Sequence, residues 1–324
     1  MKVVIFVLIG ITLSGHAFSE ELSYVPDPLI LRSEALSQMF RSSPITQKFR
    51  LGEAGDWRVS AGRTYANFWG HDKRYVIDTE MKDDQLLVFY QPLANLEVYG
   101  GYSDRGFSRM GTDSLAIGFH HLFGLPQDGR LDAKRENVRL SVPDYDLNYS
   151  ILQKNTSLSR KLEGGLVWDF ARAFALRFPM TLAVYSTHES ARFNPYFTGA
   201  TDIGSKLSMA LPLGDTSLYG SLSYTVFDGT QESDLATYGQ QWGGVFGAAQ
   251  RFDLHSELFL QFLVYQPLFR DMGQLSRSSY EVHLAYRYKW EQLSFELGLI
   301  ENIFWVYNSP DWGLSAAITY HSKP

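Results

Sequence analysis

The chain lacks cysteine entirely, which excludes disulfide bonds, thiolate chemistry and a lipid-modified cysteine anchor. It also lacks an excess of positive charge. Its 324 residues carry a formal charge of −6 at pH 7, which argues against nucleic acid as a partner. After the first twenty residues no apolar run approaches 18 residues, so membrane-spanning helices are excluded.

Motifs for cofactors and metals are missing as well. The sequence has no phosphate-binding loop and no dinucleotide fingerprint. No group of His, Asp and Glu residues has the spacing of metal ligands. We therefore expect no cofactor and no metal, and no strong motif indicates an enzyme.

The amino terminus has the pattern of an export signal. Lys2 supplies a positive start, Val3 to Leu13 form an unbroken apolar run, and small residues follow at 15–17. This pattern predicts a cleaved secretory signal peptide over residues 1–19, because a transmembrane helix would need about 20 apolar residues.

Aromatic residues are abundant, with 22 Phe, 19 Tyr and 7 Trp, and they accompany alternating strand patterns. In residues 279–290 one parity is apolar or aromatic and the other carries four ionisable side chains. Successive side chains of a strand point to opposite sides, so this strand has one apolar and one charged face. Twelve strands are predicted, at 56–68, 73–91, 94–104, 162–175, 178–188, 202–213, 215–227, 236–251, 254–268, 279–290, 292–302 and 311–320.

The connections between these strands alternate short and long without exception. An even strand number, short periplasmic turns and long external loops are typical of an outer-membrane barrel. The sequence therefore predicts an all-β fold, a transmembrane up-and-down antiparallel β-barrel over residues 55–324. A secreted or periplasmic β-rich protein is the alternative, although a Greek-key sandwich has no reason to keep this rhythm.

Two segments fall outside the strand pattern. Residues 20–54 contain three prolines and are either a periplasmic tail or a small plug in the barrel mouth, with a short amphipathic helix within Leu29 to Phe40. The excursion at 105–161 is too long for a plain loop, so we expect it to be a partly structured extracellular loop. A helix at 112–123 and an external hairpin at 140–152 are predicted within it.

Three motifs together resemble an uncharacterised bacterial family. They are the Phe-Gly-Leu-Pro…Gly-Arg element within 118–130, the stretch 204–214 with its Leu-Pro-Leu-Gly turn, and Asn-Ser-Pro-Asp-Trp-Gly at 308–313. The resemblance is to the domain-of-unknown-function family 3187, whose members look like outer-membrane barrels, and it covers about residues 25–320. It implies the fold and the location, and it brings no functional residues.

Charged residues on the inward parity are the first candidate site. They are Lys206, Glu281, His283, Arg287, Lys289 and Glu296. Charges in a lumen either set the selectivity of a solute path or brace the wall with salt bridges. Twelve strands enclose less space than the 16–18 of open porins, so we expect a narrow or partly plugged lumen.

His188 and Ser190 are the second candidate site. They share the parity of Leu182 and Val184, which predicts an outward position at the outer leaflet. A His and a Ser two residues apart on such a face resemble the site of outer-membrane phospholipases, where His acts as base to a Ser nucleophile. Those enzymes follow the Ser with Asn-Gly, whereas Ala191 and Arg192 follow here, so a polar loop junction is the simpler interpretation.

Three functions remain open at this point. The first is a channel or transporter for small or hydrophobic solutes. The second is a lipid hydrolase that uses His188 and Ser190, and the third is a non-conducting structural or surface-interaction barrel. The expected partners are outer-membrane lipid, the barrel assembly machinery and a small-molecule solute, and the expected location is the bacterial outer membrane.

Overall fold

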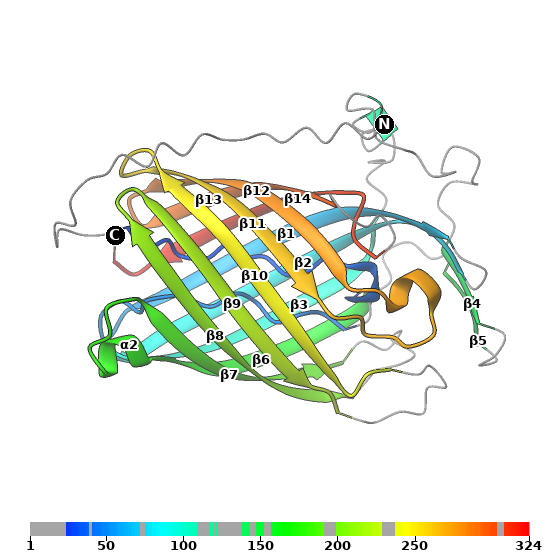
Figure 1. The fold of residues 1–324 in the computed structure, drawn as a ribbon, viewed down its shortest axis with the longest axis horizontal. Coiled ribbons are helices and arrows are strands. Elements are labelled where there is room, and N and C mark those ends of the chain that lie inside the picture. Colours follow the sequence, from blue (N-terminus) through cyan, green and yellow to red (C-terminus); the bar gives the residue numbers. More distant parts are fainter. Residues whose placement is uncertain are drawn as a thin grey trace.

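The computed structural model describes residues 24–38, 41–71, 75–108, 117–118, 121, 138–142, 147–151, 157–190, 199–228, 237–302 and 308–323. Twelve long antiparallel strands form a barrel in chain order (Figure 1). They are β1 (Trp57–His71), β2 (Tyr75–Leu93), β3 (Leu96–Ser108), β6 (Ser157–Asp169), β7 (Met180–Glu189), β8 (Thr201–Leu213), β9 (Thr216–Val226), β10 (Gln240–Arg251), β11 (Ser256–Tyr265), β12 (Ser279–Trp290), β13 (Leu293–Glu301) and β14 (Trp312–His321). The barrel is closed because β1 pairs with both β2 and β14. The predicted twelve-stranded barrel is confirmed.

One end of the barrel has the short connections, and we call it the short-turn end. The two-residue turn Gly214–Asp215 lies there, and Gly214 has a φ of +67°, which glycine adopts without strain. The connection after β6 differs from the prediction. The strand ends at Asp169 instead of continuing to 175, because Asp169 accepts a hydrogen bond from the backbone N–H of Arg172 and caps the four-residue helix α2 (Phe170–Ala173).

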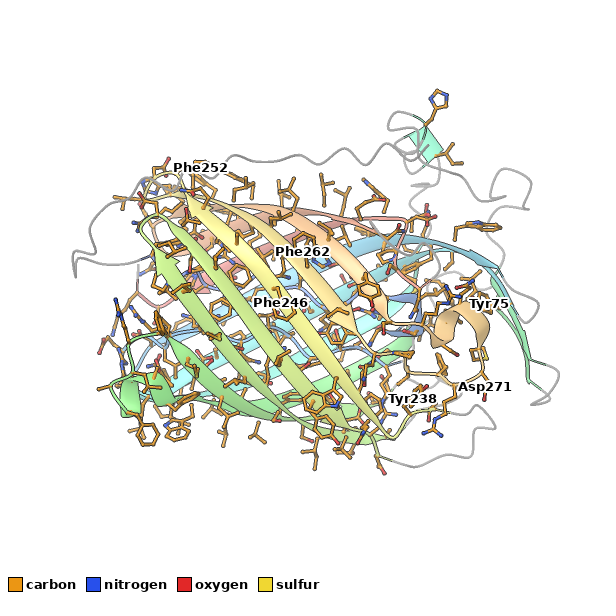
Figure 2. All side chains as sticks on the ribbon, viewed as in Figure 1. Tyr75, Tyr238, Phe246, Phe252, Phe262 and Asp271 are labelled. Atoms are coloured by element: carbon orange, nitrogen blue, oxygen red, sulfur yellow. The ribbon has the colours of Figure 1, made fainter. Side chains whose placement is uncertain are left out.

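Large apolar side chains cover the outer face, with at least one exposed on each of the twelve strands. Phe246 and Phe262 project from the middle of this face, while Phe252 and Tyr238 lie towards opposite ends (Figure 2). Aromatic pairs lie near both ends, with ring centroids 5.2 Å apart for Trp57 and Tyr320 and 4.6 Å apart for Tyr224 and Trp242. An apolar band between aromatic girdles is typical of a lipid-facing wall.

The amino-terminal segment lies inside this barrel. Residues 24–38 and 41–51, which we call the lumen segment, are almost all buried. Tyr24 donates its backbone N–H to the carbonyl of Gly214 at the short-turn end, and Leu36 donates to the carbonyl of Asn308 at the opposite, long-loop end. At Leu51 the segment is back beside Asp169, so it runs up the lumen and returns (Figure 1, blue).

The lumen segment is mostly irregular. A 3₁₀ turn, η1 (Leu36–Gln38), is its one helical element in the described part, and the predicted amphipathic helix over 29–40 is not formed there. Wall side chains bind the backbone groups that a helix would have used, since Glu281 accepts from the Glu34 N–H and Arg105 donates to the carbonyls of Ser33 and Gln38. Tertiary contacts therefore override the helical pattern.

The long excursion contains the predicted hairpin, formed by β4 (Val138–Val142) and β5 (Leu147–Ile151). β4 also pairs with the start of β2 at Tyr75–Ile77, which extends the sheet beyond the barrel. The predicted helix at 112–123 lies outside the described residues apart from 117–118 and 121, and the predicted signal peptide lies outside them too. In the described part of the chain, the helices are all too short or too polar to cross a membrane.

Candidate functional site: the lumen

The charged residues predicted for the lumen lie on the inner face. Glu281, His283 and Arg287 of β12 are 0–2% exposed, and Lys206 of β8 is 2% exposed. Glu296 of β13 is 7% exposed. Lys289 lies nearer the short-turn end and is only partly buried, with its Nζ 2.5 Å from Glu257 Oε1. The period-2 alternation thus places all six side chains on the inner face of the barrel.

Other charged wall residues were not predicted. Arg105 of β3 is 1% exposed, and its Nη2 lies 2.7 Å from Asp83 Oδ2 of β2. Lys161 of β6 lies 3.4 Å from Glu163 on the same strand. The sequence assigned Arg105 and Lys161 to the long loop, but β3 continues to Ser108 and β6 begins at Ser157. Extending the alternation by a few residues at each strand end would have identified both.

The ascending arm of the lumen segment is bound through its own polar and ionisable side chains. Arg32 donates from Nη2 to Glu163 Oε2 at 2.7 Å and from Nη1 to the Ser43 carbonyl at 2.6 Å. Glu34 Oε2 lies 3.1 Å from Arg105 Nη2. Ser33 Oγ donates to Glu281 Oε1 at 2.5 Å. This arm therefore contacts strands on opposite sides of the barrel.

The returning arm is bound mainly through its backbone carbonyls. Lys161 Nζ donates to the carbonyls of Ser42 and Ser43 at 3.0 and 3.2 Å, and Lys206 Nζ donates to the carbonyl of Ile45 at 2.5 Å. Arg41 adds a side-chain pair, with its Nε 2.8 Å from Asp202 Oδ2. Wall cations thus replace the strand partners that this extended backbone does not have.

Apolar side chains of the lumen segment also pack on the wall, in buried clusters on several sides of the barrel. Phe49 packs on Tyr219 with ring centroids 5.1 Å apart, and both belong to a buried cluster with Leu29, Phe259 and Leu263. Phe259 and Leu263 are apolar side chains on the inward face of β11 and are 0% and 3% exposed. Apolar side chains are stable at these inward positions because the lumen segment supplies an apolar surface inside the barrel.

Two carboxyl groups of the lumen segment have pKa values shifted in opposite directions. Burial raises the pKa of Glu34 well above its usual value, and the neighbouring carboxylates of Asp83 and Glu281 raise it further against the effect of Arg105 and Arg32. Burial also acts to raise the pKa of Asp27, but Lys48, Arg58, His321 and Arg287 outweigh it and hold that pKa well below the usual range. The docked lumen segment therefore favours a proton on Glu34.

His188 and Ser190 lie on the outward parity near the long-loop end, and their hydrogen bonds go to different partners. His188 Nδ1 lies 3.0 Å from Thr201 Oγ1, and Ser190 Oγ donates to the carbonyl of Arg160 at 3.0 Å. A base and its nucleophile need a hydrogen bond to each other. The lipid-hydrolase hypothesis stays a prediction, and these contacts give it no support.

Metal ligation is not indicated by the described residues, in which no group of three or more His, Asp or Glu side chains is arranged to hold an ion. What the lumen offers is a charged wall and a segment bound to it.

Comparison with one solved structure supports the architecture, and two further structures are less similar. The COG4313 outer membrane channel from Pseudomonas putida F1 is similar in fold, with a TM-score of 0.54 at 10% identity over 86% of this chain and 100% of that chain. The TodX deltaS2S3 mutant monoaromatic hydrocarbon channel gives 0.40 at 8% identity, over 84% and 91% of the two chains. The outer membrane channel DcaP of Acinetobacter baumannii gives 0.31 at 10% identity, over 84% and 99%.

Sequence comparison identifies the family. No curated protein matches the chain. The model of the family described as "Protein of unknown function (DUF3187)" matches residues 5–322, nearly the whole length, which confirms the resemblance seen in the sequence. The chain belongs to the DUF3187 family.

Proposed function

We propose that this protein is an outer-membrane channel for small polar solutes, held closed by its lumen segment and opened when that segment moves. The observation that carries the proposal is the nature of the bonds between segment and wall. Beside apolar packing, these contacts include ion pairs and side-chain hydrogen bonds, such as those of Arg32 and Arg41, that water and solute can replace. Export by the predicted signal peptide and placement in outer-membrane lipid are parts of the same proposal.

The width of the barrel supports a path. Barrels of about eight strands fill their interior with wall side chains, whereas twelve strands leave space that wall side chains alone do not fill. Here a separate stretch of chain, the lumen segment at 24–38 and 41–51, occupies that space. A purely structural barrel would not need an insert bound by polar contacts, and a polar lumen favours polar over hydrophobic solutes.

The orientation follows from the connections. Short turns face the periplasm in barrels of this kind, so the lumen segment enters from the periplasmic side and returns there. Both arms reach the short-turn end, with Tyr24 beside Gly214 and Leu51 beside Asp169. The segment therefore leaves the lumen towards the periplasm without unthreading any strand.

Single-channel recording in planar lipid bilayers tests this function. Arg41→Gln removes the pair with Asp202, which we expect to loosen the segment and to increase the fraction of time in conducting states over the unmodified chain. Arg63→Gln is the matched control, because Arg63 pairs with Asp84 on the outer face and does not touch the lumen. A barrel that inserts but never conducts, in either variant or in the unmodified chain, would contradict the channel and favour a structural role.

A further inference from the structure

Buried charge on the wall is unequally divided. In the described parts of the twelve strands nine carboxylates are buried against five basic side chains. The carboxylates are Asp83, Glu97, Glu163, Asp169, Glu189, Asp202, Glu257, Glu281 and Glu296, and the basic side chains are Arg58, Arg105, Lys161, Lys206 and Arg287. The wall by itself is therefore acidic.

The lumen segment carries the opposite sign. Residues 24–51 contain four basic side chains and two carboxylates. Arg32 is bonded to Glu163 and Arg41 to Asp202, so two of the four basic side chains neutralise wall carboxylates directly. The segment thus fills the lumen and also compensates its charge.

Most basic side chains of the wall would keep their partners without the segment. Arg58 pairs with Glu97, Arg105 with Asp83, and Arg287 with both Glu257 and Glu296, all between residues of the wall. These pairs brace the wall. They do not offset the carboxylates that the segment uncovers.

Departure of the segment would uncover three carboxylates in particular. Asp202 would lose Arg41, and Glu163 would lose Arg32 while keeping Lys161. Glu281 would lose the Ser33 hydroxyl and the Glu34 backbone N–H, both of which donate to it. Lys206, now bonded to segment carbonyls, would be uncovered as well, which leaves carboxylates in excess.

We infer that the open lumen selects cations, and that Glu163, Asp202 and Glu281 are the groups that bind them. Rings and clusters of Asp and Glu are the usual basis of cation selectivity in pores. A narrow path between low-dielectric walls strengthens the field of such charges. The carboxylates of Glu163 and Asp202 bind guanidinium groups of the segment in the closed state, so solutes with guanidinium or ammonium groups match them best.

This inference rests on the proposed channel, and the test keeps the two apart. Reversal potentials are measured on conducting states of the full chain carrying Arg41→Gln, across a tenfold KCl gradient. We expect a reversal potential that is shifted from zero towards the equilibrium potential of potassium. Potassium chloride is the probe because it reports charge preference without a chosen organic solute.

Two further variants assign the selectivity to the named groups. Adding Asp202→Asn or Glu281→Gln is expected to shift the reversal potential towards zero. Asp104→Asn is the matched control, since Asp104 pairs with Arg160 on the outer face and its loss changes net charge equally. A chloride preference, no preference, or equal shifts from Asp104→Asn and Asp202→Asn would overturn the inference while leaving the channel intact. Complete absence of current would instead overturn the channel.

Discussion

The two faces of β12 are held by different kinds of contact. Leu284 and Tyr286 face outward and are 40% and 43% exposed, whereas Glu281 and His283 face the lumen and are at most 1% exposed. The outer face needs lipid around it, because apolar surface in water is unfavourable. The inner face is covered by polar bonds to the lumen segment, which water can replace. One alternating strand therefore has an outer face that stays in lipid, which we call the permanent face. Its inner face has contacts with the lumen segment that can break and re-form, and we call it the reversible face.

The largest effect is expected from breaking a buried ion pair on the reversible face. Arg32→Gln leaves the Glu163 carboxylate with Lys161 alone and should cost about 3 kcal/mol of docking free energy. Limited proteolysis of the folded barrel measures this, with cleavage inside residues 24–51 expected in the variant and protection in the parent. Equal protection in both proteins would show that polar contacts do not hold the segment, and Arg63→Gln on the outer face serves as the control.

A charge on the permanent, outer face should destabilise the fold of the barrel itself. Leu222→Arg places a charge on the outward parity of β9 and should cost about 2–4 kcal/mol of folding free energy if Leu222 lies near the membrane centre. Leu254→Arg is the control, since Leu254 lies in a turn at the rim and is already 80% exposed. Heat-modifiable electrophoresis after refolding into lipid vesicles reports the folded fraction. An equal loss from the two variants would contradict the lipid-facing assignment.

A smaller effect is expected from overpacking against a buried tyrosine on the inner face of the barrel. Gly204 of β8 lies under the ring of Tyr185, so an added Cβ would meet ring atoms at 2.3 Å. Gly204→Ala should destabilise the barrel by about 1–3 kcal/mol, because the ring must shift. Gly100→Ala is the control, since its Cβ would have its nearest neighbour at 3.9 Å. Urea midpoints in lipid compare them, and similar midpoints would mean that the tyrosine moves freely.

The smallest effect is expected from pH. A released Glu34 titrates near its ordinary pKa of 4.5, and the docked Glu34 has a raised pKa, so docking takes up a proton. Docking stability is therefore complete below pH 4.5 and falls by up to about 1.4 kcal/mol per pH unit as pH rises towards the docked pKa. Conducting time should increase with pH, and Glu34→Gln should remove that dependence. An unchanged pH profile in Glu34→Gln would exclude this residue as the cause.

The wall was predictable from sequence because its signal is local. Alternation in 279–290 assigned both faces of β12 correctly, and the rhythm of short and long connections identified the closed barrel. The lumen segment was not predictable in this way. The buried Ser33 donates a hydrogen bond from its hydroxyl to Glu281, which lies 248 positions away in the sequence. No periodic pattern within residues 20–54 predicts such a distant partner. The apolar residues on the inward parity of β11, such as Phe259, have the same explanation, since their apolar contacts belong to another part of the chain.

The central claim is that the lumen segment closes the barrel and must move for conduction. Ser42 on the segment and Ser159 on β6 have their hydroxyl oxygens 3.4 Å apart, so Ser42→Cys with Ser159→Cys places two thiols together in a chain that has no other cysteine. Conductance of this double variant is measured oxidised and then reduced. The account predicts suppressed conducting states when oxidised and their return on reduction. Equal conductance in both states, with the disulfide shown to have formed, would contradict it.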